Sequence, residues 1–125
     1  MAQVLANPYS LEEVILNLLN NARDAVEDRQ ERENGFEPKV QLRTLSSKSK
    51  PSQVHIEIKD NGGGIPKEIQ EKVFDPFFTT KDPDKGTGLG LSISKTIVEE
   101  LDGNLALKPQ DGKNTTLTIS LPIAR

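Results

Sequence analysis

The sequence Asp60-Asn61-Gly62-Gly63-Gly64-Ile65 places a carboxylate directly before three glycines. Residues 54–59 before it alternate between apolar and polar side chains, which predicts a half-buried strand with Asp60 on the apolar side. A carboxylate facing a core is costly unless it accepts hydrogen bonds, and an adenine amino group with a bridging water would donate them. Glycines allow positive φ and let a flat ring lie against the main chain. The stretch predicts a nucleotide pocket; the alternative is an Asn-Gly hairpin turn with a solvated Asp60.

Three other motifs accompany this stretch in a set order. They are Asn17-Leu18-Leu19-Asn20-Asn21-Ala22, Phe74-Asp75-Pro76-Phe77-Phe78-Thr79-Thr80-Lys81, and Gly86-Thr87-Gly88-Leu89-Gly90-Leu91. A single glycine-rich run is weak evidence, but four motifs in order are strong evidence. Together they resemble the N box, first glycine box, F box and second glycine box of sensor histidine kinases, over about residues 6–122. The run Asn21-Ala22-Arg23-Asp24-Ala25 is most similar to the nitrogen-regulation branch of these kinases.

The resemblance implies the ATP-binding catalytic domain of such a kinase, in a superfamily shared with DNA gyrase, the ninety-kilodalton heat-shock chaperone and the MutL repair proteins. The implied fold is a two-layer α/β sandwich, the Bergerat ATP-binding fold. It has a mixed, mostly antiparallel sheet with three helices on one face. Residues 1–125 are expected to form this one domain, as an excised fragment of a larger sensor that lacks the dimerisation and phosphoacceptor domain.

Composition limits the alternatives. The chain has 125 residues, no cysteine, no tryptophan, one tyrosine and a net charge of -3. These values fit one domain in a reducing compartment and argue against nucleic-acid binding. No signal peptide pattern and no apolar run long enough to span a bilayer is present. We therefore expect a cytoplasmic domain without membrane contact, whether or not its parent protein is membrane-anchored.

The expected elements follow from periodicity and capping signals. Ser10 and Glu13 form a capping box that predicts a helix start, and Asn34-Gly35 predicts its end. Residues 4–5 are expected to form a short strand, 39–44 a strand with Val40 and Leu42 inward, and 54–60 its antiparallel partner. A short helix is expected after Pro66, a longer one up to residue 101, and final strands over residues 104–107 and 115–121.

The first helix carries two stripes. By three-four spacing, its core stripe consists of Leu11, Val14, Ile15, Leu18, Ala22, Ala25 and Val26. Asn17, Asn21 and Asp24 follow the edge of that stripe, although asparagine is a poor helix former. An amide oxygen is a suitable ligand for Mg²⁺ already carried by phosphates. The alternative is a solvated helix flank.

The resemblance assigns roles to individual residues. Asn21 would bind Mg²⁺ and Asn17 would support metal or phosphate nearby, whereas Asp24 stands where several relatives have a basic residue. Asp60 would select adenine, Gly62 and Gly64 would shape the pocket, and Ile65 would line it. Thr115 would touch the adenine site, although Asn114 replaces the usual glycine before it. The phosphate and lid residues would be Thr79, Thr80, Lys81, Lys85, Gly86, Thr87, Gly88, Leu89, Gly90 and Leu91.

The expected chemistry is phosphoryl transfer rather than hydrolysis. Hydrolytic relatives carry a glutamate four residues before the metal-binding asparagine, where this chain has Asn17. An amide cannot act as a general base, so ATP hydrolysis should be slow. The resemblance implies that the γ-phosphate goes to a histidine on a separate dimerisation domain, and from there to a response regulator. His55, in a strand and on its polar side, is interpreted as a solvated residue.

Two other functions remain open from the sequence. One is an ATP-binding regulatory module that gates partner docking without phosphotransfer. The other is an ATPase clamp fragment of the gyrase or MutL kind, which Asn17 opposes.

Overall fold

The computed structural model describes residues 8–47, 52–76, 90–108 and 114–123. In chain order the elements are α1 (Pro8–Arg32), β1 (Val40–Ser47), β2 (Gln53–Asp60), α2 (Lys67–Gln70), α3 (Gly90–Glu100), β3 (Asn104–Leu107) and β4 (Thr115–Pro122). The expected strand over residues 4–5 lies outside the described residues.

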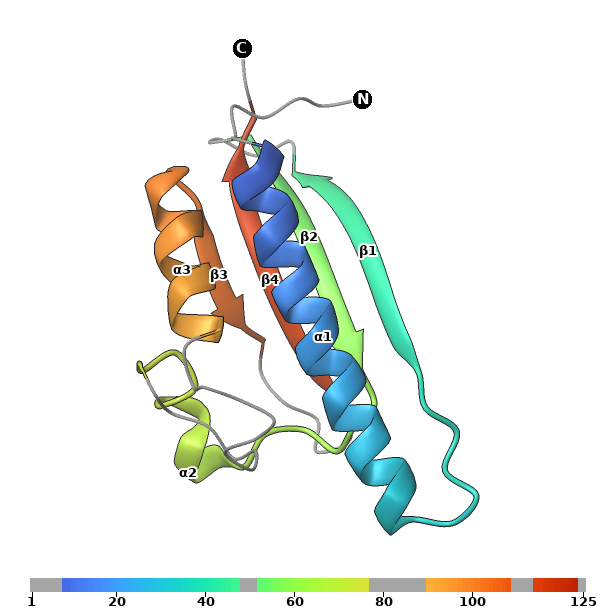
Figure 1. Ribbon diagram of the computed structural model, residues 1–125. Helices are drawn as coiled ribbons and strands as arrows, with labels where there is room; N and C mark the ends of the chain where they lie inside the picture. Colours follow the sequence, from blue (N-terminus) through green and yellow to red (C-terminus); the bar gives the residue numbers. More distant parts are fainter. Residues whose placement is uncertain (1–7, 48–51, 77–89, 109–113, 124–125) are drawn as a thin grey trace.

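The described strands form one sheet in the order β1-β2-β4-β3, and each neighbouring pair is antiparallel. Helices α1 and α3 lie side by side on one face of this sheet, and the one-turn helix α2 lies near its end (Figure 1). The expected two-layer α/β class is confirmed. Of the three helices that the structure describes, two cover the sheet rather than all three, and the described part of the sheet contains only antiparallel pairs.

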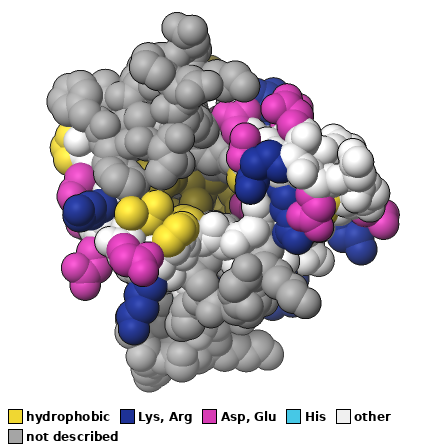
Figure 2. Space-filling view, turned by 90° about the horizontal axis from the view of Figure 1, so that it is seen from below, with side chains coloured by type: hydrophobic (Ala, Val, Ile, Leu, Met, Phe, Trp, Pro, Cys, Tyr) yellow, Lys and Arg dark blue, Asp and Glu magenta, His cyan; other side chains and the backbone are white. Residues whose placement is uncertain are grey.

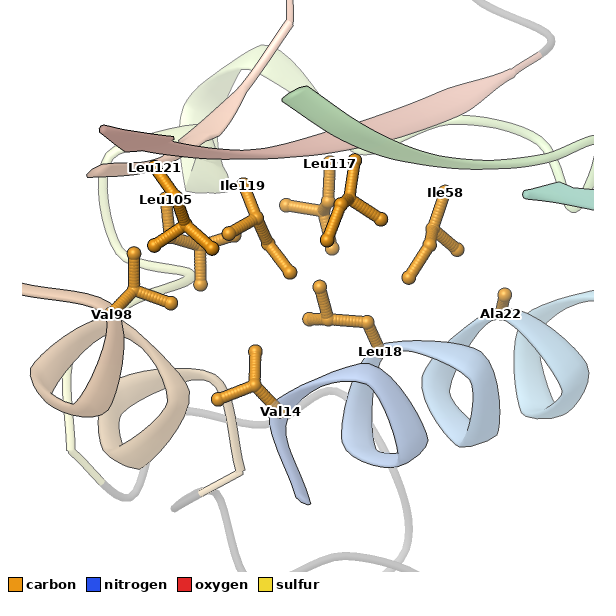
Figure 3. Close-up of a cluster of buried hydrophobic side chains, with 10 residues drawn as sticks. Val14, Leu18, Ala22, Ile58, Val98, Leu105, Leu117, Ile119 and Leu121 are labelled. Atoms are coloured by element: carbon orange, nitrogen blue, oxygen red, sulfur yellow. The ribbon is translucent and has the colours of Figure 1, made fainter. Parts of the chain in front are cut away.

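The core lies between the two helices and the sheet. Val14, Leu18 and Ala22 of α1 and Val98 of α3 point toward the strands, whose apolar side chains point back at them (Figure 3). The strand residues in this cluster are Ile56, Ile58, Leu105, Leu117, Ile119 and Leu121. The predicted core stripe of the first helix is confirmed, because its members are buried or packed against this cluster, apart from the half-buried Ala25.

The other face of the sheet is polar, and its centre is an ion-pair cluster. Glu57 on β2 is only 6% exposed, and its carboxylate pairs with Lys108 and with Arg43 of β1, the latter at 3.1 Å. The Lys108 ammonium, and after it Arg43, hold the pKa of Glu57 below its usual value despite burial. His55, on the same face, hydrogen-bonds through Nδ1 to the Ser120 hydroxyl at 2.7 Å. Its predicted position on the polar side of the strand is confirmed.

Val40 and Leu42 lie on the predicted inward side of the sheet, but they are not buried there. They are 42% and 47% exposed. Leu42 pairs with Ile58 and therefore shares the side of the sheet that faces the helices. However, β1 lies at the edge of the described sheet, beside rather than beneath α1 (Figure 1). Alternation predicts which face a residue is on, but not whether a helix covers it.

The predicted helix start at Ser10 is wrong, by two residues. Helix α1 begins at Pro8, a residue suited to the first helical position because its φ is fixed and it lacks an N–H. Ser10 is therefore inside the first turn. At the other end, α1 stops at Arg32, and Gly35 adopts a φ of 80° in the turn beyond it. Among the described residues, no helix has the length and hydrophobicity that crossing a bilayer requires.

Leu18 provides a test of the core. Its side chain is 0% exposed, so Leu18→Ala should lower the free energy of unfolding by about 2 to 5 kcal/mol, from lost burial and a residual cavity. Leu16→Ala is the matched control on the same helix, because Leu16 is 51% exposed, and it should cost less than about 0.5 kcal/mol. Urea denaturation of both variants measures the difference; equal losses would contradict the assigned helix face.

Candidate functional site

Asp60 lies at the end of β2 and is buried there. Its exposed fraction is 6%, and its register partner on β4 is Thr115, which is 9% exposed. The backbone amide of Gly62 donates a hydrogen bond to Asp60 Oδ1 at 2.9 Å. This is the one hydrogen bond to the carboxylate that the described part of the chain makes. The alternative of a solvated Asp60 in a hairpin turn is therefore wrong.

The pKa of Asp60 reflects this setting. Burial raises the pKa of the carboxyl group above its usual value, because a low-dielectric environment disfavours the charged form. The hydrogen bond from Gly62 opposes part of that rise. A further donor to the carboxylate would stabilise its charged form, so this position favours a ligand that presents an N–H group.

The glycines after Asp60 bring the backbone against α1. A Cβ at Gly62 would lie 2.8 Å from the Ala25 Cβ and 2.9 Å from its carbonyl carbon, too close for any other residue. Gly63 and Gly64 have φ values of 119° and 77°, which only glycine adopts without strain. Ile65 follows, with its carbonyl accepting a hydrogen bond from the Gln70 side chain at 2.9 Å. The loop therefore packs against α1 at Gly62 and is hydrogen-bonded to α2 at Ile65.

The end of the molecule that carries this loop is hollowed. Figure 2 shows hydrophobic side chains at the bottom of a hollow in this view, with charged and other polar side chains around parts of its rim. A concave surface with an apolar floor and a few convergent polar groups is the usual form of a small-molecule site.

Asn17, Asn21 and Asp24 follow one side of α1 toward the glycine loop. Each is half-buried, and Asp24 directly precedes the Ala25 that contacts Gly62. Asn17 Nδ2 donates to the hydroxyl of Ser94, on α3, at 3.3 Å. The predicted second stripe therefore lies at the junction of α1 with the loop and with α3, and not on a solvated flank.

Three residues in these contacts had no role in the sequence interpretation. Ser94 is 0% exposed and lies on the buried side of α3. A polar residue at a position where helical spacing predicts an apolar one could have indicated its role. Asn61 lies inside the glycine motif, and Arg29 near the end of α1 donates to its carbonyl at 2.6 Å. No sequence pattern links Arg29 to Asn61, since they are 32 residues apart.

The second glycine motif is described only at its end. Gly90 begins α3, and Leu91 packs against the core cluster. The remaining predicted phosphate and lid residues lie outside the described residues: Thr79, Thr80, Lys81, Lys85, Gly86, Thr87, Gly88 and Leu89. Phe74, the first residue of the F box, also packs against the core, and the Lys95 ammonium lies 4.9 Å from its ring centroid.

Similarity to known proteins agrees with this geometry. Residues 6–125 match the model of the histidine kinase-, DNA gyrase B- and HSP90-like ATPase family. The chain belongs to this family.

Within the family, the chain is similar to sensor kinases. It is 41% identical over 114 residues to the two-component sensor PprA of Pseudomonas aeruginosa, covering 91% of this chain and 12% of PprA. It is 33% identical over 132 residues to the sensory histidine kinase/phosphatase NtrB of Vibrio alginolyticus, covering 100% of this chain and 35% of NtrB. The structure of the mycobacterial sensor histidine kinase MprB aligns with a TM-score of 0.76 at 28% identity, covering 96% of this chain and 76% of that chain.

Membership in an ATPase family implies ATP and, with it, a metal ion. The surroundings of Asp60 fit a purine, because they combine a buried acceptor with a glycine loop whose backbone lies too close to α1 for a Cβ. No cluster of three acidic or histidine residues within the described ranges could hold a metal alone.

Asp60 should make the nucleotide-free domain less stable at neutral pH. The pKa of Asp60 is higher in the folded state than in the unfolded state. The contribution of Asp60 to the free energy of unfolding is therefore most favourable at a pH below its unfolded-state pKa. This contribution is lost as the pH rises through the folded-state pKa. Asp60→Asn should therefore increase the free energy of unfolding of the nucleotide-free domain at pH 7, and the gain should vanish at a pH below the unfolded pKa of Asp60. Denaturation at both pH values measures this.

The matched control is Asp75→Asn, because Asp75 is an exposed aspartate. It should leave stability nearly unchanged at both pH values. A loss of stability in Asp60→Asn at pH 7 would contradict the assigned electrostatics.

Proposed function

We propose that this domain binds Mg-ATP and donates the γ-phosphate to a histidine on a separate dimerisation domain, as the catalytic part of a sensor histidine kinase. The observation that carries the proposal is the buried Asp60 carboxylate, which accepts a hydrogen bond from the glycine loop beside it. A buried carboxylate beside a glycine loop is suited to an exocyclic amino group, which adenine has and guanine lacks at the corresponding position.

Adenine recognition would involve residues from three parts of the chain. Asp60 would accept from the amino group, and Thr115, its register partner on β4, would contact the base or a bridging water. Gly62 and Gly64 would leave room for the ring, and Ile65 would supply an apolar wall. Their common position at one end of β2 and β4 supports this grouping.

Magnesium and phosphate binding would use the edges of α1 and α3. Asn21 would offer an amide oxygen to Mg²⁺, which supplies charge neutralisation on the phosphates when it is bound. Asp24 would lie beside this group, with a carboxylate in place of the basic residue that a direct phosphate contact would need. The start of α3, at Gly90 and Leu91, would present backbone amides to an anion. The roles predicted for Lys81 and Lys85 and for residues 79–80 and 86–89 remain predictions.

The chain's own residues favour retention of ATP over its hydrolysis. Asn17 stands where a hydrolytic enzyme would need a general base, and its amide nitrogen is engaged with Ser94. Asn17 would therefore position metal or phosphate without activating water. Transfer would then wait for an imidazole nucleophile from a partner domain, and the phosphoryl group would pass from it to a response regulator.

The acceptor histidine would have to come from elsewhere in a longer protein. His55, the single histidine of the chain, lies on the polar face of the sheet, opposite the face toward which Asp60 points. NtrB is among several similar sensors, and PprA is more similar. We propose the nitrogen-regulation branch on the sequence of residues 21–25 alone, because similarity to known sensors does not single it out.

The test is phosphotransfer in trans. The domain is incubated with γ-labelled ATP, Mg²⁺ and a histidine-containing dimerisation domain from a related kinase, and label on the acceptor is followed. Asn21→Ala should reduce transfer by roughly tenfold or more, because a metal-positioning contact is lost. Asn20→Ala is the matched control, since Asn20 is the exposed neighbour, and it should transfer normally. Calorimetry on the same samples should show ATP binding that depends on Mg²⁺ and weakens in Asn21→Ala.

Other outcomes separate the alternatives. Tight ATP binding without transfer to any supplied acceptor would favour a regulatory module. Rapid ATP hydrolysis by the isolated domain would favour an ATPase clamp. Absence of ATP binding by the wild type would contradict the proposal altogether.

A further inference from the structure

The peptide between Asn61 and Gly62 connects two hydrogen bonds. Its N–H, from Gly62, donates to Asp60 Oδ1 at 2.9 Å, and its carbonyl oxygen, from Asn61, accepts from Arg29 Nη1 at 2.6 Å. Because a peptide group is planar, an anchor on the carbonyl also fixes the direction of the N–H. Arg29 therefore acts on the orientation of the Asp60 carboxylate, although the two side chains do not pair with each other.

Arg29 is itself held in place. Its Nε donates to Glu33 Oε2 at 2.9 Å, and its guanidinium carbon lies 4.4 Å from the centroid of the Phe36 ring. The side chain is 24% exposed, much less than Arg32 on the next turn, at 66%. The guanidinium has separate N–H groups for Glu33 and for the Asn61 carbonyl, a geometry that lysine cannot reproduce.

The Asn61 side chain and amide fix the same segment from the other direction. Its Oδ1 accepts from the Lys39 amide at 2.8 Å, and its Nδ2 donates to the Glu37 carbonyl at 2.9 Å. Its own amide donates to the Lys39 carbonyl at 3.2 Å. Asn61 of the glycine loop is thus held from two directions. Arg29 binds it from the end of α1, and the turn between α1 and β1 binds it from the other side.

We propose that Arg29 is a positioning residue for adenine selectivity, acting through the Asn61–Gly62 peptide on the Asp60 carboxylate. The proposal rests on the proposed function, since it assumes that Asp60 reads the adenine amino group. A cation on the carbonyl polarises the peptide and strengthens the opposite N–H as a donor, as in other connected hydrogen bonds. The competing explanation is that Arg29 only ties the end of α1 to the loop, with no effect on base choice.

The experiment compares affinities for ATP and ITP in the wild type, Arg29→Ala, Arg29→Lys and Arg32→Ala. In ITP a carbonyl oxygen replaces the amino group, so the ratio of the two affinities measures recognition at Asp60. We expect Arg29→Ala to lower the ATP-over-ITP ratio by roughly fivefold to tenfold, about the value of one hydrogen bond. Arg29→Lys should fall between Arg29→Ala and the wild type. Arg32→Ala should keep the wild-type ratio, because the ion pair that the structure describes for Arg32 is with Asp28, on the exposed surface of α1.

A second measurement covers the case in which Arg29→Ala folds poorly. Amide exchange in nucleotide-free Arg29→Lys should be faster at Gly62 than in the wild type, with core amides of β2 unchanged. An unchanged ATP-over-ITP ratio in Arg29→Ala, or equal weakening of both nucleotides, would overturn the positioning role while leaving the proposed function intact. A wild type that binds ATP no better than ITP would overturn both.

Discussion

The burial of one carboxylate constrains the site end of this domain. Alternation along β2 puts Asp60 in the same row as Ile56 and Ile58, facing the helices. A charge there must be hydrogen-bonded, and within the described residues the glycine loop supplies that bond through Gly62. The loop can do so only because Gly62 has no side chain to collide with α1. The burial of Asp60 therefore accounts for three features: the turn after β2, the contact of that turn with α1, and the raised pKa of Asp60.

The packing that stabilises the fold also positions the candidate site. One stripe of α1 fills the core through Val14, Leu18, Ala22 and Val26, and the adjacent stripe presents the asparagines at its edge. Rotation of the helix would move both stripes together, so the direction of the site side chains is set by apolar burial. The hydrogen bond from Asn17 to Ser94 adds a direct link between the helices on which metal and phosphate contacts are proposed.

Much of this arrangement could be predicted from the sequence, because it depends on local periodicity. Spacing alone predicts the core stripe of the first helix and three strands, at residues 54–60, 104–107 and 115–121. The exposure of Val40 and Leu42 could not be predicted, since alternation does not report which strand a helix covers. The contact of Arg29 with Asn61 depends on how the end of α1 meets a distant loop, which no local pattern encodes. The helix start at Pro8 shows that a capping box does not by itself fix the first residue of a helix.

The most direct test of the account is the pKa of the Asp60 carboxyl, followed by carbon NMR as ATP is added. In the nucleotide-free domain this pKa should lie above the usual value of an aspartate, because the carboxyl group is buried. Saturation with ATP should lower it, because an adenine amino group donating to the carboxylate stabilises the charged form. A pKa that stays unchanged or rises on ATP binding would contradict the claim that Asp60 recognises the base.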